Sequence, residues 1–126
     1  MDFIKRIFIW WRGATIGTLW TTARTGHPVG TDSLGNRYYQ DASGKRRWVL
    51  YRATVDASLV PPEWHGWLHH TFKEPPTVTP FKVKPWEQEH RPNLTGTPLA
   101  LRPQGSLAES GIRPAATGDY QAWQPE

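Results

Sequence analysis

Proline is distributed very unevenly along this chain of 126 residues, and its distribution limits where regular structure can form. Nine of the twelve prolines and four of the eleven glycines lie from residue 75 onward. Proline has no backbone N–H to donate to a helix or a sheet, and its ring fixes φ at about −65°. The sequence therefore predicts sparse helix and strand over residues 75–126 and places the folded core before them.

The residues before this region divide into two segments. A chain of this length supplies one modest core, and only 37% of its residues are hydrophobic. We predict an amphipathic helix and linker over residues 1–24, a small β-meander plus a short helix over 25–74, and an extended, partner-wrapping tail over 75–126. The predicted fold class is α+β with much irregular structure.

Residues 3–12 have the pattern of an amphipathic helix. Aromatic and aliphatic side chains share one side of a helical wheel, and three basic side chains share the other. Such a helix suits the headgroup layer of an anionic membrane or the flank of a membrane subunit; docking on the chain's own fold and an organelle-targeting presequence are the alternatives. Its uncharged run, residues 7–11, is too short for a membrane span. The residues predicted to make this contact are Phe3, Ile4, Lys5, Arg6, Ile7, Phe8, Trp10, Trp11 and Arg12.

The middle of the chain predicts a three-stranded antiparallel meander. Its extended runs are residues 28–33, 37–41 and 46–51, separated by turns that contain glycine and asparagine. In the third run successive residues point to opposite sides, so one face can pack while the other stays polar. Basic and aromatic residues also interleave here, as on surfaces that stack RNA bases, and the net charge is +4. A small RNA-binding protein is therefore the alternative function from another class. The order of glycine and aromatic residues found in RNA-recognition motifs is missing, however, so we predict no nucleic-acid partner.

A short helix is predicted over residues 62–72. Pro61 and Pro62 suit the entry to a helix, and the pair Pro75-Pro76 ends it. Four side chains recur at helical spacing and form one buried face. They are Trp64, Trp67, Leu68 and Thr71. We expect this face to anchor the thin sheet or to anchor a partner.

Two histidines of the same helix, His65 and His69, have the i, i+4 spacing of zinc ligands. The residues between them are Gly-Trp-Leu, so the general-base glutamate of the His-Glu-x-x-His metalloprotease motif is absent. A third ligand would have to come from His70, His90 or a distant carboxylate. We therefore predict exposed or hydrogen-bonding histidines and no metal site.

Motifs for catalysis are missing from the sequence. The chain has no cysteine, which excludes disulfides, zinc thiolates, a cysteine nucleophile and a self-ligated iron–sulfur cluster. Gly30 and Gly35 have the spacing of a phosphate-binding loop, but Asn36 follows them where that loop needs lysine. There is also no Gly-x-Ser-x-Gly turn for a nucleophile. We predict a non-catalytic interaction protein that carries no cofactor.

The tail of residues 75–126 brings few side chains to offset its ordering, which costs about 1–2 kcal/mol per residue in backbone entropy. It is therefore either disordered or ordered by a partner. Apolar residues spaced along it favour a partner, because disordered segments are poor in aromatics. These residues are Phe81, Trp86, Leu94, Leu99, Leu101, Tyr120 and Trp123.

Six sequence runs, taken in order, carry a family resemblance. They are "GTDSLGNRYYQ", "RRWVLY", "VPPEWHGWLHH", "EPPT", "NLTGTP" and "GDYQAWQP". Together they resemble the NADH dehydrogenase (ubiquinone) 1 alpha subcomplex subunit twelve family, an accessory subunit of respiratory complex I. The resemblance extends from about residue 17 to residue 125, and the runs "PWEQEHRPNLTGTP" and "GDYQAWQP" look like the alpha-proteobacterial form.

The resemblance implies a supernumerary subunit without a redox cofactor, bound to the peripheral arm near its junction with the membrane arm. It places the chain on the cytoplasmic side of the bacterial inner membrane, with the matrix side of the mitochondrial inner membrane as the alternative. The implied partners are the iron–sulfur subunit with two clusters, the quinone-module subunits and the small zinc-binding accessory subunit. A transient assembly factor of complex I is the alternative function. The predicted partner-binding residues are Trp64, His65, Trp67, Trp86, Tyr120 and Trp123.

Overall fold

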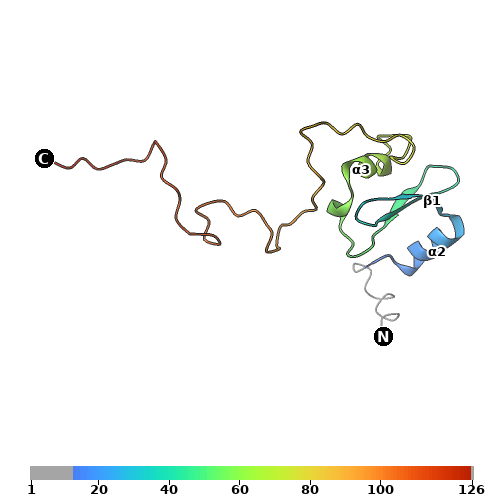
Figure 1. The fold of residues 1–126 in the computed structure, drawn as a ribbon. Helices are drawn as coiled ribbons and strands as arrows, with labels where there is room; N and C mark the ends of the chain where they lie inside the picture. The colour runs from blue at the N-terminus through green and yellow to red at the C-terminus, as the bar shows by residue number, and fades with distance from the viewer. Residues whose placement is uncertain (1–12, 126) are drawn as a thin grey trace. The chain divides into compact units, whose positions relative to one another are not determined.

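The computed structural model describes residues 13–125 and contains two helices, one 3₁₀ turn and three strands (Figure 1). In chain order these are α2 (Ile16–Thr25), β1 (His27–Thr31), β2 (Arg37–Gln40), β3 (Arg47–Leu50), η2 (Ala57–Leu59) and α3 (Pro62–Leu68). The predicted α+β class is confirmed. The helix predicted over residues 3–12 lies outside the described residues.

The chain divides into two compact units, Met1–Asn93 and Leu94–Glu126. All the helices and strands of the described residues belong to the first unit. Residues 94–125 form a series of hydrogen-bonded turns; one joins Thr97 N to Leu94 O, and another joins Glu109 N to Ser106 O. The part of the chain that the structure describes holds no helix long and apolar enough to cross a membrane.

The helix α2 begins at its N-cap, Thr15, whose side chain accepts a hydrogen bond from Thr18 N at 3.1 Å. It was not predicted from the sequence, because four of its ten residues are threonine, a β-branched residue with weak helix propensity. The hydroxyls of Thr22 and Thr25 donate to carbonyls four residues earlier at 2.7 and 2.9 Å. The side-chain cap at Thr15 and the hydrogen bond that Thr22 accepts from Trp48 therefore support a helix whose intrinsic propensity is low.

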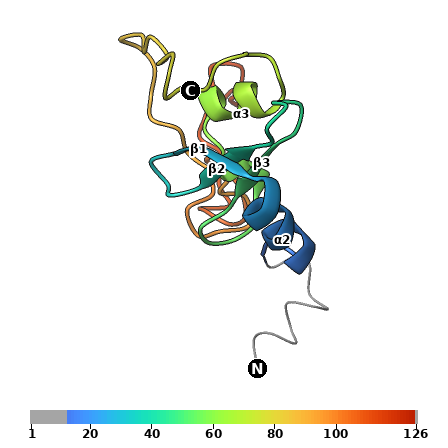
Figure 2. The same ribbon diagram turned by 90° about the vertical axis from the view of Figure 1, so that its right-hand side faces the viewer.

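The three strands form one antiparallel sheet in the order β1-β2-β3, which confirms the predicted meander (Figure 2). Each strand end lies within two residues of its prediction. The register shifts between Pro28 and Gly30, where β1 bulges against β2. An added Cβ at Gly30 would lie 2.8 Å from the Trp64 ring, so the close approach of α3 to β1 requires glycine there.

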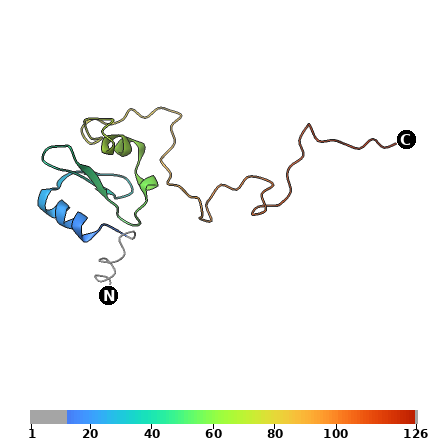
Figure 3. The same ribbon diagram turned by 180° about the vertical axis from the view of Figure 1, so that it is seen from behind.

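Both faces of the sheet are covered, α3 lying on one side and α2 on the other (Figure 3). The paired residues Tyr38 and Val49 point toward α3. The next pair, Tyr39 and Trp48, points the other way; their rings stack with centroids 6.2 Å apart, and Trp48 Nε1 donates to Thr22 Oγ1 of α2 at 2.9 Å. The expectation that β3 leaves one face polar is therefore wrong, because α2 covers that face.

The core is built mainly from aromatic rings. Tyr38 stacks on Trp64 with ring centroids 4.0 Å apart and planes 7° apart. Trp67 meets both rings edge to face, at 6.4 Å from Tyr38 and 5.7 Å from Trp64. Val60 completes the buried cluster. The partly buried residues around it are Val29, Val49, Tyr51 and Leu68.

The helix α3 ends at Leu68, four residues earlier than predicted. His70 adopts a left-handed conformation with φ at 59°, and Thr71 N donates to Gly66 O at 2.9 Å, the pairing that closes a Schellman motif. Thr71 is therefore exposed, and its predicted place on the buried face is wrong. The Phe72 ring folds over Gly66, where an added Cβ would lie 2.2 Å from it.

Arg47 on β3 holds the segment that follows α3. Its guanidinium lies over the Trp67 ring, 4.8 Å from the centroid. It donates to Trp67 O at 2.6 Å, to Phe72 O at 2.9 Å and to Lys73 O at 3.1 Å. A cation beside the last carbonyls of a helix also complements the helix dipole.

A polar network fixes the turn between β1 and β2. The buried Asn36 donates to Asp32 Oδ2 at 2.9 Å and to Leu59 O at 3.2 Å, and it accepts from Arg52 N at 3.2 Å. The Tyr38 hydroxyl donates to the same Asp32 oxygen at 2.7 Å. Burial, followed by this hydrogen bond to Asp32, raises the pKa of Tyr38 well above its ordinary value.

Replacing Trp67 with alanine tests the aromatic core. Trp67 is fully buried, so Trp67→Ala should lower the free energy of unfolding by about 3–5 kcal/mol, as for other buried tryptophans. The control is Trp86→Ala, because Trp86 is 73% exposed and should change the same quantity by about 0.5 kcal/mol or less. Urea unfolding followed by circular dichroism measures both. Equal effects of the two substitutions would contradict this core.

Replacing Tyr38 with phenylalanine tests the polar network. The loss of its hydrogen bond should cost about 1 kcal/mol at neutral pH. Because the folded pKa is raised, the stabilisation is complete below the ordinary tyrosine pKa of about 10 and is lost as the pH rises above it. Tyr38→Phe should therefore flatten the fall of stability above about pH 10. Urea unfolding across this pH range measures the effect, and Tyr120→Phe is the control because Tyr120 is exposed. If the network were absent, the two variants would show the same dependence of stability on pH.

Candidate functional site

The two tryptophans of the predicted partner-binding set, Trp64 and Trp67, lie in the core and are 3% and 0% exposed. Of the two roles that the sequence left open for them, anchoring the thin sheet is the one that this structure supplies. Their rings are occupied by Tyr38 and by each other. With so little of either ring exposed, neither tryptophan offers its ring to another protein.

The histidines of α3 lie at the surface. His65 and His69 stack with ring centroids 4.0 Å apart, and His69 Nδ1–H donates to His65 O at 2.9 Å. Within residues 13–125, no three histidine, cysteine, aspartate or glutamate side chains come together in a group that could hold a metal ion. His65 is exposed, between the buried Trp64 and Gly66 of the same helix.

Residues 72–93 return to the sheet and α3, and Trp86 lies on this segment. At one end the Phe72 and Phe81 rings meet edge to face at 5.0 Å. At the other end His90 Nε2 donates to Ser58 O at 2.7 Å, next to α3. The Trp86 ring stays exposed, with Lys84 Nζ 5.5 Å from its centroid. These long-range contacts had no signal in the sequence, because they join residues with no shared motif or spacing.

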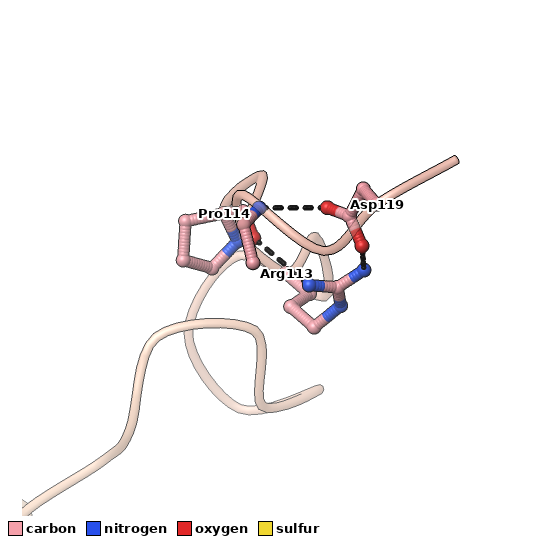
Figure 4. A network of polar contacts seen from close by, with 4 residues as sticks. Arg113, Pro114 and Asp119 are labelled. Atoms are coloured by element: carbon pink, nitrogen blue, oxygen red, sulfur yellow. Dashed lines mark hydrogen bonds and ion pairs between the residues drawn. The ribbon is translucent and has the colours of Figure 1, made fainter. Parts of the chain in front are cut away.

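The last two residues of the predicted set, Tyr120 and Trp123, are 88% and 80% exposed and follow a tight turn. Asp119 accepts a hydrogen bond from the Arg113 guanidinium at 2.5 Å and one from Ala116 N at 2.7 Å (Figure 4). The hydrogen bond from the Arg113 guanidinium, followed by the one from Ala116 N–H, lowers the pKa of the Asp119 carboxyl. The turn thus fixes the backbone immediately before both exposed aromatic residues.

Comparison with known proteins places these features in a family. The family model described as NADH ubiquinone oxidoreductase subunit NDUFA12 matches residues 26–125. The NADH dehydrogenase (ubiquinone) 1 alpha subcomplex subunit 12 of Bos taurus is 44% identical, over 64% of this chain and 64% of that protein. This chain therefore spans slightly less than two thirds of the bovine relative. The match confirms the family predicted from the sequence.

Two further relatives concern the bacterial type of this chain and the choice between a subunit and an assembly factor. A protein of Rickettsia prowazekii is 34% identical over 50% of this chain and 67% of its own length, which supports the predicted alpha-proteobacterial type. The NADH dehydrogenase (ubiquinone) 1 alpha subcomplex assembly factor 2 of Mus musculus is also 34% identical, over 93% of this chain and 95% of its own length. A protein named as a subunit and one named as an assembly factor are thus both among the relatives.

The turn before Tyr120 is testable through the ionisation of Asp119. Because the folded pKa is lowered, the ionised carboxylate supports the turn above its ordinary pKa of about 4, and this support is lost as the pH falls through the lowered value. Arg113→Ala should move the pKa of Asp119 upward and weaken the protection of the Ala116 amide. An NMR titration of the Asp119 carboxyl measures this, with Arg102→Ala as the control because that side chain binds Ala108 O elsewhere. An unchanged pKa in Arg113→Ala would refute the ion pair.

Proposed function

This chain belongs to the NADH ubiquinone oxidoreductase subunit NDUFA12 family, and on that premise we propose that it is a non-catalytic accessory subunit of the proton-pumping NADH:quinone oxidoreductase, complex I. In this proposal it binds the peripheral arm near its junction with the membrane arm and supports the assembly or stability of the complex. The observation that carries the proposal is the family match over residues 26–125, which includes the sheet, α3 and the C-terminal turns.

Exposed aromatic rings support a role in binding. Trp86, Tyr120 and Trp123 lie outside every helix and strand and expose most of their surface. A buried aromatic side chain removes about 150–250 Å² from water, and aromatic residues dominate the binding energy of interfaces. Leaving three such rings exposed on a chain with so few apolar residues is unfavourable unless a partner covers them. We propose that they contact other complex I subunits, with His65 as a further contact from α3.

The proposed neighbours are the iron–sulfur subunit with two clusters, the quinone-module subunits and the small zinc-binding accessory subunit. The proposed location is the cytoplasmic side of the bacterial inner membrane, with the mitochondrial matrix side as the alternative, and residues 3–12 at the membrane surface. The chain itself transfers no electrons in this proposal. Its lack of cysteine supports that, because iron–sulfur clusters are held mainly by thiolates.

A transient assembly factor is the second candidate. The mouse assembly factor aligns with 93% of this chain, a larger share than the bovine subunit covers. The bovine subunit is the more similar of the two at 44% identity against 34%. The two functions differ in one observable property: a subunit remains in the active enzyme, whereas an assembly factor leaves before activity appears.

Purification through a tag on this chain from solubilised native membranes tests the proposal. A subunit should recover complex I subunits in stoichiometric amounts together with NADH:quinone activity, as measured by mass spectrometry and an activity assay. Inactive, partly assembled species would indicate the assembly factor. Recovery of the chain without respiratory subunits would overturn both functions.

The aromatic contacts are tested by Trp86→Ala combined with Tyr120→Ala and Trp123→Ala. Each truncation should cost about 1–2 kcal/mol or more of binding, so recovery of the complex should fall at least tenfold. Folding should be unaffected because all three rings lie outside the core. The matched control is Leu107→Ala, an exposed apolar residue in the same unit as Tyr120. Retention of the triple variant at the wild-type level would show that these rings are not contacts.

A further inference from the structure

An open groove of about 710 Å³ lies between the start of α3 and the segment that returns over residues 80–90. Pro61 and Pro62 form one side, and Phe81 and Val83 lie on the other. The volume is within the range of about 300–1,000 Å³ that is typical of ligand sites. Rings of proline and phenylalanine give its sides an apolar and stiff character.

The charge of the groove is opposite to that of the whole chain. Glu63, Glu87 and Glu89 line it, and none of the described residues that line it is lysine or arginine. The chain as a whole carries a net charge of +4. Within residues 13–125, Glu63 and Glu89 form no ion pair, and Glu87 accepts one hydrogen bond from Lys84 N at 2.9 Å. Three carboxylates in a lining whose described residues include no lysine or arginine form a surface that attracts a positively charged ligand.

Both sides of the groove are fixed to the folded unit. The α3 side carries Trp64, whose ring is buried against Tyr38. The returning segment is held through Phe81 on Phe72 and through His90 on Ser58. An ordered groove needs little rearrangement to accept a ligand, so less of the binding energy is lost to ordering it.

We propose that this groove binds an extended, basic segment of a partner protein, with arginine or lysine side chains facing the three glutamates and small apolar residues or prolines between them. Charge complementarity favours this occupant: an acidic segment would be repelled, and an uncharged one would leave the carboxylates without partners. Apolar sides flanked by prolines suit an extended peptide whose side chains alternate between the groove and solvent. The inference rests on the proposed function in one respect, because it takes the partner to be another subunit of the complex.

A labelled short peptide that alternates arginine with proline and leucine tests the groove on the full chain. Fluorescence anisotropy should show binding that weakens with added salt, and the same peptide with glutamate in place of arginine should not bind. Glu63→Gln combined with Glu89→Gln should weaken binding about tenfold. The matched control is Glu109→Gln combined with Glu126→Gln, which changes the net charge equally and lies in the other unit. Melting temperatures confirm that each variant is folded.

NMR chemical shifts of the wild-type chain locate the peptide independently of any variant. Shifts concentrated at Phe81 and Val83 support the proposal, and shifts confined to other residues overturn it. Binding that appears only after Lys5, Arg6 and Arg12 are replaced with glutamine would assign the groove to the chain's own N-terminal segment and overturn the partner assignment. Dimerisation that the Glu63 and Glu89 substitutions abolish would assign it to a second copy instead.

Purification from membranes separates this inference from the proposed function. If the wild-type chain recovers complex I but the Glu63 and Glu89 variant does so equally well and the arginine peptide does not bind, the groove inference fails and the subunit proposal stands. If no respiratory subunits are recovered while the peptide still binds the groove, the subunit proposal fails and the groove remains a basic-peptide site.

Discussion

The stack of Tyr38 on Trp64 is the contact on which the rest of the fold depends. Strands of four or five residues and a seven-residue helix supply too few aliphatic side chains to make a core, so large rings fill it. The same tyrosine reaches out of the core through its hydroxyl to Asp32, and Asp32 binds the buried Asn36. Tyr38 therefore joins the sheet, α3 and the first turn. Its removal should lower the free energy of unfolding by more than the loss of its buried apolar area alone.

Arg47 extends this core to the segment that follows. The helix α3 is short and ends at Leu68, two residues before the left-handed His70, so its last carbonyls lack partners within the helix. Arg47 supplies donors to Trp67 O and Phe72 O while its guanidinium covers the Trp67 ring. Arg47 thus holds the backbone at Phe72, where the returning segment begins. Because the Phe72 ring contacts Phe81, the same contact helps to position the side of the groove that Phe81 forms.

The parts of the fold with a repeating pattern were predictable, and those set by single contacts were not. Alternation and turn residues predicted the meander, and the proline pairs predicted α3. The helix α2 was missed because threonine has weak helix propensity, and the end of α3 was misplaced because His70 adopts a conformation that favours glycine. Spacing identified Trp64 and Trp67 as anchors, but only the packing showed that their partner is the chain's own sheet.

The tryptophans within residues 13–125 therefore include two kinds, buried and exposed, whose mutation has different consequences. Loss of Trp64 or Trp67 destabilises the core, so a complex that contains this chain would be reduced indirectly, because less folded chain is present. Loss of Trp86 or Trp123 leaves the core intact and removes only surface that a partner can cover. A defect in the complex thus identifies a contact only when the variant chain is still folded and present, and the exposed rings are the positions where this condition is met.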